Sequence, residues 1–139
     1  MKNDNNFAVA LTKCFYCGKD DAIVMTKLLT PKNARDVESM NGKVIDMTPC
    51  QECKKLMDQG IILITFDPEK SLPGWDTERI PNPYRTGGFF VVQEKAMLNI
   101  IGNKTLAEFI IKYRWMFIEH NAAEQLGLFK FMEDNKDVT

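Results

Sequence analysis

Two Cys-x-x-Cys motifs constrain this chain more than any other feature of its sequence. Cys14 and Cys17 form the first motif, Cys50 and Cys53 form the second, and these are the four cysteines of the 139-residue chain. The two-residue gap lets both sulfur atoms of a motif reach one ion, and two motifs supply the four ligands of a structural zinc site. We therefore expect one structural Zn²⁺, with a redox dithiol or an iron–sulfur cluster as alternatives. Since four thiolates leave no open position for water or substrate, such a site stabilises the fold and performs no catalysis.

The residues around the motifs predict a knuckle, a hairpin and a helix. Gly18 suits the tight turn that a metal knuckle requires, because glycine adopts positive φ without strain. A β-prone run over 22–29, a turn over 30–33, an Asn-Gly dipeptide at 41–42 and a strand over 43–47 would form the hairpin. Thr48 and Pro49 favour a helix start that places the second motif on the first turn, and Gly60 favours its end. This order is that of a treble clef.

The same residues resemble the zinc-binding domain at the start of the ClpX chaperone. Both Cys-x-x-Cys motifs belong to the resemblance. Gly-Lys follows the first motif, and a leucine lies three residues after the second. The matching positions are Cys14, Cys17, Gly18, Lys19, Cys50, Cys53 and Leu56. The resemblance covers residues 14–60, with a longer gap between the motifs than in that family. No Gly-x-x-x-x-Gly-Lys-Ser/Thr loop of its ATPase follows. The resemblance implies a treble-clef zinc fold and that family's habit of dimerising and gripping other proteins.

The rest of the chain predicts a small β element covered by helices. A nearly continuous apolar run over 61–66 is typical of a strand buried on both faces, and 89–92 would pair with it. The proline-rich stretch 67–88 predicts an irregular loop. A short helix over 94–101 and a long helix from a capping box at Thr105 and Glu108 to about residue 126 would follow, then an apolar piece over 128–132. We therefore expect an α+β fold, with a zinc unit over 1–60 and a second unit over 61–139 that shares one core with it or stands alone.

The charge balance argues against a dedicated nucleic-acid-binding surface. The chain carries 18 basic and 19 acidic side chains, and the lysines of the zinc half alternate with aspartates and glutamates. Nucleic-acid binding depends on clustered Lys and Arg that displace counterions, and no such cluster is present. The apolar run over 7–11 is too short for a signal-peptide core, and no run approaches the roughly 18 residues of a membrane span. We expect a cytoplasmic protein, with nucleic-acid binding as the alternative to a protein partner.

The sequence offers no convincing catalytic set. His120 is the one histidine, and a treble-clef nuclease would need such a residue on the metal-binding helix; a half-buried helix histidine is the simpler interpretation. The acidic pairs Asp67/Glu69 and Asp76/Glu78 lie in the proline-rich loop, where solvated charge is expected. The run 85–88 leads into a strand, which favours a turn over a phosphate cradle. We therefore expect no enzymatic activity, with a metalloenzyme as a remote alternative.

The proline-rich loop carries the candidate contact residues. Trp75, Tyr84 and Arg85 belong to the residue types enriched at interface hot spots, although Trp75 could equally pin the loop to the core. The function expected is that of a non-enzymatic, zinc-stabilised protein-interaction module, a small adaptor, regulator or inhibitor of the kind common in bacteria and their phages. The partner would be a protein, and a homodimer stays open as an alternative.

Overall fold

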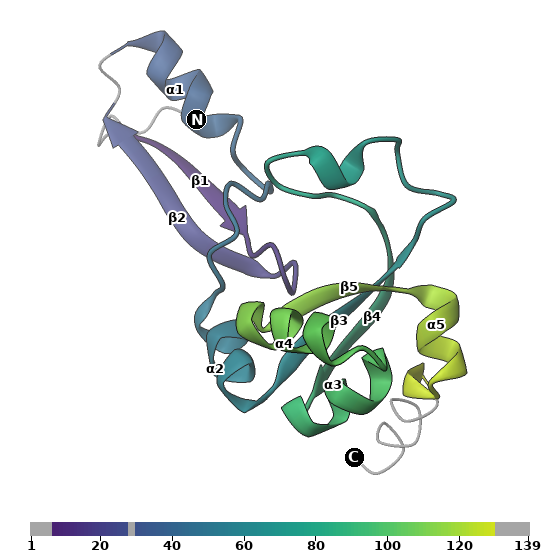
Figure 1. Ribbon diagram of the computed structural model, residues 1–139. Helices are drawn as coiled ribbons and strands as arrows, with labels where there is room; N and C mark the ends of the chain where they lie inside the picture. Colours follow the sequence, from purple (N-terminus) through teal and green to yellow (C-terminus); the bar gives the residue numbers. More distant parts are fainter. Residues whose placement is uncertain (1–6, 28–29, 130–139) are drawn as a thin grey trace. The chain divides into compact units, whose positions relative to one another are not determined.

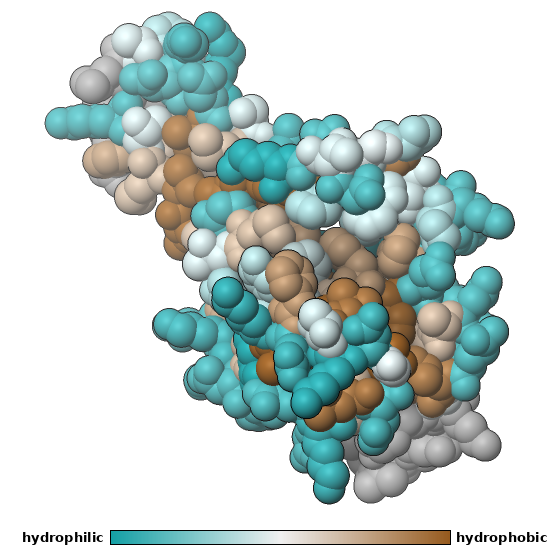
Figure 2. Space-filling view, in the orientation of Figure 1, coloured by the Kyte–Doolittle hydropathy of each residue, from teal (hydrophilic) through white to brown (hydrophobic). Residues whose placement is uncertain are grey.

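The computed structural model describes residues 7–27 and 30–129, which form a mixed α+β structure (Figure 1). The chain divides within a helix into two compact units, Met1–Cys53 and Lys54–Thr139. The boundary expected at residue 60, and the choice between one shared core and two, stay predictions. Among the described residues, no helix has the length and apolar character needed to cross a membrane. Figure 2 shows, in the orientation of Figure 1, where hydrophobic and hydrophilic residues lie on one face of the molecule.

A two-stranded hairpin and one helix build the first unit. Strands β1 (Phe7–Lys13) and β2 (Asp20–Lys27) pair antiparallel, and the first cysteine motif lies in the connection between them. One face of β1 carries the small buried residues Ala8 and Ala10, which pack with Val37 of helix α1 (Pro31–Glu38). The other face of the hairpin is turned to solvent. The aliphatic cluster that joins the hairpin to α1 is therefore small, and the buried rings of Phe15 and Tyr16 add to the apolar interior of this unit.

The segment after β2 differs from the expected hairpin. Residues 30–33 begin α1 instead of forming a turn: the Thr30 hydroxyl accepts the Asn33 N–H at 3.2 Å, and Pro31 occupies the first helical turn. The residues 43–47 form no strand, because the partner of β2 is β1 and not this segment. Helix α2 (Gln51–Gln59) follows as expected, although it begins after Cys50 and not at Thr48.

A three-stranded sheet forms the centre of the second unit. Its order is β4-β3-β5, in which β4 (Tyr84–Val92) runs antiparallel and β5 (Trp115–Glu119) runs parallel to the central strand β3 (Ile61–Asp67). Every residue of β3 from Ile61 to Phe66 is buried, which confirms the prediction from its continuous apolar run. The strand expected over 89–92 is present and begins five residues earlier.

Helices cover one face of this sheet. Helix α3 (Glu94–Ile101) ends before Gly102 as predicted, and α4 (Lys104–Tyr113) and α5 (His120–Gln125) follow. A short 3-10 helix (Trp75–Thr77) lies in the long connection between β3 and β4. Side chains of the sheet and the three helices form one core cluster: Ile61, Leu63, Phe90, Met97, Ile110, Ile118 and Ala123. Leu128 and Phe129 pack against this core, whereas the rest of the apolar piece predicted over 128–132 lies outside the described residues.

The long helix expected from Thr105 to residue 126 is wrong. Helix α4 stops at Tyr113, because Arg114 adopts a left-handed conformation with φ of 70° and the chain turns into β5. The Arg114 Nε donates a hydrogen bond to the Met57 carbonyl at 2.8 Å, and its guanidinium pairs with Glu94. The N-cap of α4 also differs from the predicted Thr105. It is Asn103, whose side chain accepts the Leu106 N–H at 3.1 Å. The single predicted helix is therefore a helix, a strand and a second short helix.

Gly60 joins α2 to β3 at a point where no side chain fits. A Cβ atom built on Gly60 would lie 2.4 Å from the Val92 carbonyl oxygen and 3.0 Å from its carbon, both in the backbone of β4. The Gly60 N–H closes α2 by donating to the Leu56 carbonyl at 2.9 Å. Glycine is therefore required here by close approach of the backbone and not only by the end of the helix.

We predict that Gly60→Ala lowers the free energy of unfolding by about 1–3 kcal/mol, because the added methyl group displaces β4 from the central strand. Chemical denaturation followed by circular dichroism measures the change. The exposed neighbour Gln59, changed to alanine, is the matched control and should stay within about 0.5 kcal/mol of the parent. Equal stability of the two variants would show that the close approach is not a real constraint.

Candidate metal centre

The four cysteines of the two motifs converge at one point of the first unit. Their sulfur atoms all lie within 4.8 Å of one another, with Cys14 Sγ 3.9 Å from Cys53 Sγ and Cys17 Sγ 3.8 Å from Cys50 Sγ. A disulfide bond needs about 2.05 Å between its sulfur atoms, so all four cysteines are free thiols. The predicted set of metal-ligating residues is thus brought together at one site that could hold a metal ion.

Local backbone geometry places each sulfur atom. In the first motif the Gly18 N–H donates to the Cys14 carbonyl and the Cys14 N–H donates to the Lys19 carbonyl, both at 2.9 Å, which folds the connection of the hairpin into a knuckle. In the second motif the Cys53 N–H points at Cys50 Sγ at 3.5 Å, on the first turn of α2. The Tyr16 hydroxyl donates to the Met47 carbonyl at 2.8 Å. This last bond ties the first knuckle to the segment that leads into the second.

The surroundings of the thiols make their ionisation interdependent. Burial, together with the Coulombic effect of Cys14, raises the pKa of the Cys53 thiol far above its ordinary value, and burial likewise raises the pKa of Cys17. Burial opposes ionisation of Cys14 as well, but backbone N–H groups, that of Cys17 foremost, hold its pKa below the ordinary value. Ionising the whole set therefore needs a positive ion at its centre, because adjacent thiolates repel one another.

The spacing of the sulfur atoms fits a tetrahedral metal ion. A metal–sulfur bond of about 2.3 Å, as in zinc–thiolate sites, gives an edge of about 3.8 Å between neighbouring ligands of a regular tetrahedron. The two measured distances, 3.9 and 3.8 Å, agree with this value. Four thiolates select zinc or an iron centre over harder ions such as Mg²⁺ or Ca²⁺. A metal with this shell would have no free position for substrate.

The residues predicted to contact a partner lie in the second unit, on and beside the connection between β3 and β4. The Trp75 ring packs between Phe66 and Phe117, with ring centroids 5.1 and 5.8 Å away, so it holds the connection against the sheet. Tyr84 is half exposed, and Arg85 lies over the Phe117 ring. A role for Trp75, Tyr84 and Arg85 in partner binding stays a prediction.

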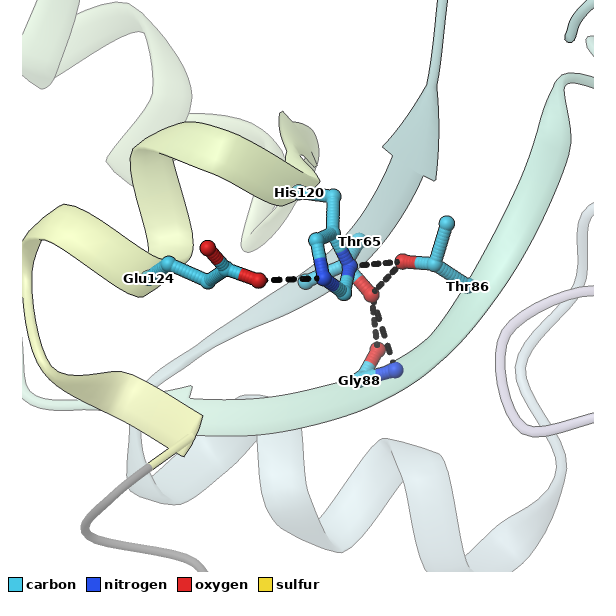
Figure 3. Close-up of polar contacts among 5 residues, drawn as sticks. All are labelled: Thr65, Thr86, Gly88, His120 and Glu124. Carbon is cyan, nitrogen blue, oxygen red and sulfur yellow. Dashed lines mark hydrogen bonds and ion pairs between the residues drawn. The ribbon is translucent and has the colours of Figure 1, made fainter.

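A chain of hydrogen bonds links three elements of the second unit (Figure 3). The His120 ring lies between Glu124 and Thr86, with 2.8 Å from Nε2 to the Glu124 carboxylate and 2.8 Å from Nδ1 to the Thr86 hydroxyl. The Thr86 hydroxyl lies 2.6 Å from that of Thr65, which also accepts the Gly88 N–H at 2.8 Å. Sequence reasoning predicted His120 as a half-buried helix histidine and missed both partners. Thr86 lies on a strand that is distant in the chain, whereas Glu124 lies four residues later in the same helix, a spacing that the sequence does show.

The carboxylate, imidazole and hydroxyl groups of Glu124, His120 and Thr86 follow one another in the order of a catalytic triad. With Nε2–H donating to Glu124, Nδ1 accepts from Thr86, Thr86 from Thr65 and Thr65 from Gly88, so every member is satisfied. His120 borders a hollow of about 410 Å³, whose other lining residues are Asp67, Pro68, Glu69, Glu119 and Asn121. Thr86 does not line that hollow. The hydrogen bonds among Thr65, Thr86, Gly88, His120 and Glu124 tie β3, β4 and α5 together.

We predict that Cys53→Ser removes the metal from the purified protein and unfolds the first unit, because a buried ligand is lost from a closed shell. Elemental analysis and thermal melting measure the two effects. The His120→Ala variant is the control and should keep the full metal content, since His120 contacts Thr86 and Glu124 and no cysteine. Full metal content in Cys53→Ser, or loss of metal in His120→Ala, would contradict the four-cysteine site.

We predict that Thr65→Val costs about 1–3 kcal/mol of stability, because it leaves the Gly88 N–H without its acceptor inside the protein. Urea unfolding of the metal-loaded protein measures the cost. Thr105→Val makes the same chemical change at an exposed helical position and should be nearly neutral. A small, equal effect of both substitutions would mean that the network contributes nothing to folding.

Comparison with known proteins gives the site no relative. No protein-family model, no curated protein and no solved structure matches this chain. The resemblance to the ClpX zinc-binding domain, and with it the treble-clef assignment, therefore stays a prediction that rests on the two motifs and on the converging cysteines.

Proposed function

We propose that this protein is a non-enzymatic, zinc-stabilised interaction module that binds another protein. The observation that supports the zinc site is the convergence of four cysteine sulfur atoms within 4.8 Å of one another, with two of their separations at 3.9 and 3.8 Å. Zinc is the metal that most often fills such a shell for a structural purpose, and its binding energy contributes directly to folding. The small aliphatic core of the first unit makes that contribution necessary.

A hollow on the connection between β3 and β4 supports the proposal that the partner is a protein. It has a volume of about 460 Å³, and its walls combine apolar and charged side chains: Leu72, Pro73, Trp75, Glu78, Arg79, Ile80 and Asn82. Leu72 is 77% exposed at its edge, whereas Trp75 is held in place by the aromatic side chains of the sheet. An aromatic anchor beside an exposed aliphatic side chain and a charged rim is typical of protein-interaction hot spots.

The charges of the zinc-containing unit favour a protein over a nucleic acid. Two of its lysines are engaged by carboxylates: Lys13 Nζ lies 2.5 Å from Asp20, and Lys19 Nζ lies 3.5 Å from Glu52. Neutralised lysines do not displace counterions from a phosphate backbone. A four-thiolate metal site adds two further negative charges. These charges therefore disfavour nucleic-acid binding. A metalloenzyme would need an open position on the metal, which a shell of four thiolates does not leave.

We predict that the tagged, zinc-loaded protein captures one stoichiometric protein from a nuclease-treated lysate of the cells in which it is made. Leu72→Asp should abolish capture, because it places a charge at the edge of the hollow without disturbing buried side chains. Phe109→Asp is the matched control, since Phe109 is similarly exposed on α4 but far along the chain from the hollow. Quantitative mass spectrometry of the captured material measures both.

Three outcomes contradict parts of this proposal. Recovery of nucleic acid alone, or bands that vanish after nuclease treatment, would support the nucleic-acid alternative. Loss of capture in Phe109→Asp and not in Leu72→Asp would move the contact to the exposed face of α4. Turnover of an added substrate by the zinc-loaded protein, if Cys53→Ser abolishes it, would refute the non-enzymatic role.

A further inference from the structure

The outer face of the β1–β2 hairpin is apolar and exposed. Side chains that alternate along both strands form it: Val9, Leu11, Ile23 and Met25, which pair across the strands as Val9–Met25 and Leu11–Ile23. Ile23 and Met25 of β2 are 66% and 58% exposed. The most exposed side chains of this face thus belong to β2, the strand with a free edge.

The direction of the backbone groups can be derived from the partners of Leu11. Its carbonyl accepts the Gly42 N–H at 2.8 Å and its N–H donates to the Asn41 side chain at 2.9 Å, so both groups point away from β2. In an antiparallel ladder, residues opposite each other that turn their backbone groups outward form a non-hydrogen-bonded pair. Ile23, opposite Leu11, therefore points its N–H and carbonyl away from β1, and so does Met25 two residues later.

The two edges of the hairpin are treated differently. The edge of β1 is covered at Leu11 and Lys13 by backbone and side-chain groups of residues 41–43. Among the described residues, β2 has β1 as its only strand neighbour. Its middle, residues 22–26, reads Ala-Ile-Val-Met-Thr and carries no charged residue or proline that would protect an edge. Such a strand is a template for addition of another strand.

We propose that two copies of this chain form a dimer in which β2 of one pairs antiparallel with β2 of the other. The two-fold axis passes at Val24, so that Ile23 lies opposite the partner subunit's Met25. The two hairpins then form one four-stranded sheet of order β1-β2-β2-β1. The inference concerns the first unit alone and is independent of the hollow that carries the proposed function.

The charges at the two ends of β2 favour a second copy of this chain as the partner strand, and they favour one register of pairing. Asp21 is the second residue of β2, near the point where the register with β1 shifts, and Lys27 is the last. Antiparallel pairing about Val24 places Asp21 of each copy opposite the partner's Lys27, twice in one dimer. A register shifted by two residues would place Asp21 opposite a methionine or Lys27 opposite an isoleucine. Neither Asp21 nor Lys27 forms an ion pair among the described residues, and opposite charges across a strand pair stabilise it.

Sedimentation equilibrium of the full-length, metal-loaded protein across the micromolar range tests the dimer. The parent protein should show a reversible monomer–dimer equilibrium. Met25→Pro removes an outward N–H that only the second copy would use, so the dimer dissociation constant should rise about tenfold or more while the hairpin persists. Metal content and thermal melting verify that the variant is folded. Val9→Lys is the control: it places a charge on the same apolar face but away from the free edge, and should leave the dimer intact.

A charge exchange tests the register. Lys27→Glu sets two like charges opposite each other and should weaken the dimer, whereas the double variant Asp21→Lys/Lys27→Glu should restore it. A single species of monomer mass at all concentrations would overturn the proposal. A dimer that Val9→Lys weakens as much as Met25→Pro would also overturn it, because the copies would then pack face to face. Partner capture that persists in a monomeric parent protein would leave the proposed function standing and this inference refuted.

Discussion

The mutual repulsion of four crowded thiolates is the constraint on which the first unit depends. The sulfur atoms lie within 4.8 Å of one another, and burial keeps at least two of the thiols from ionising unaided. Without a cation the cluster is a set of neutral thiols that attract each other weakly, and the aliphatic core beside it consists mainly of two alanines and a valine. With a divalent ion, the same cluster closes the long loop between Cys17 and Cys50. The hairpin connection and the first turn of α2 are then fixed by the same ion.

The parts of the fold that the sequence predicts are those in which one local signal dominates. The two motifs converge as expected, because their spacing serves a single ligand geometry. The continuous apolar run of β3 could only be a strand buried on both faces, and Gly102 ends α3. In these places the sequence pattern and the tertiary structure demand the same backbone, so no competing contact changes the result.

The errors arise where tertiary contacts override a periodic pattern. Leu106, Phe109, Ile110 and Tyr113 have the spacing of an apolar helical stripe, which predicts that all four are buried. Ile110 is buried and faces the core with Ala107, whereas the other three are about half exposed. No glycine or proline announces the end of α4. Arg114 adopts a left-handed conformation, which its contacts with Met57 and Glu94 stabilise. The residues after it pair in parallel with β3. The local sequence shows neither these contacts nor this pairing. The same holds for the contact of His120 with Thr86 of β4, which forms only after the sheet is assembled.

The position of the metal site links the chemistry of the cysteines to the proposed assembly. The first knuckle lies in the connection between β1 and β2, and the bulged register at Lys13 and Asp20 is its immediate continuation. An ion that fixes the knuckle therefore also fixes the pairing of the two strands, and an isolated two-stranded hairpin is marginal in water. The edge of β2 keeps its paired geometry only while that support is present. A dimer formed through this edge would present two copies of the hollow in the second unit, and two linked sites raise the effective affinity for a partner that is itself repeated. Metal binding would then stabilise the hairpin through which the protein self-associates, and self-association would add avidity to partner binding without a contact between hairpin and hollow.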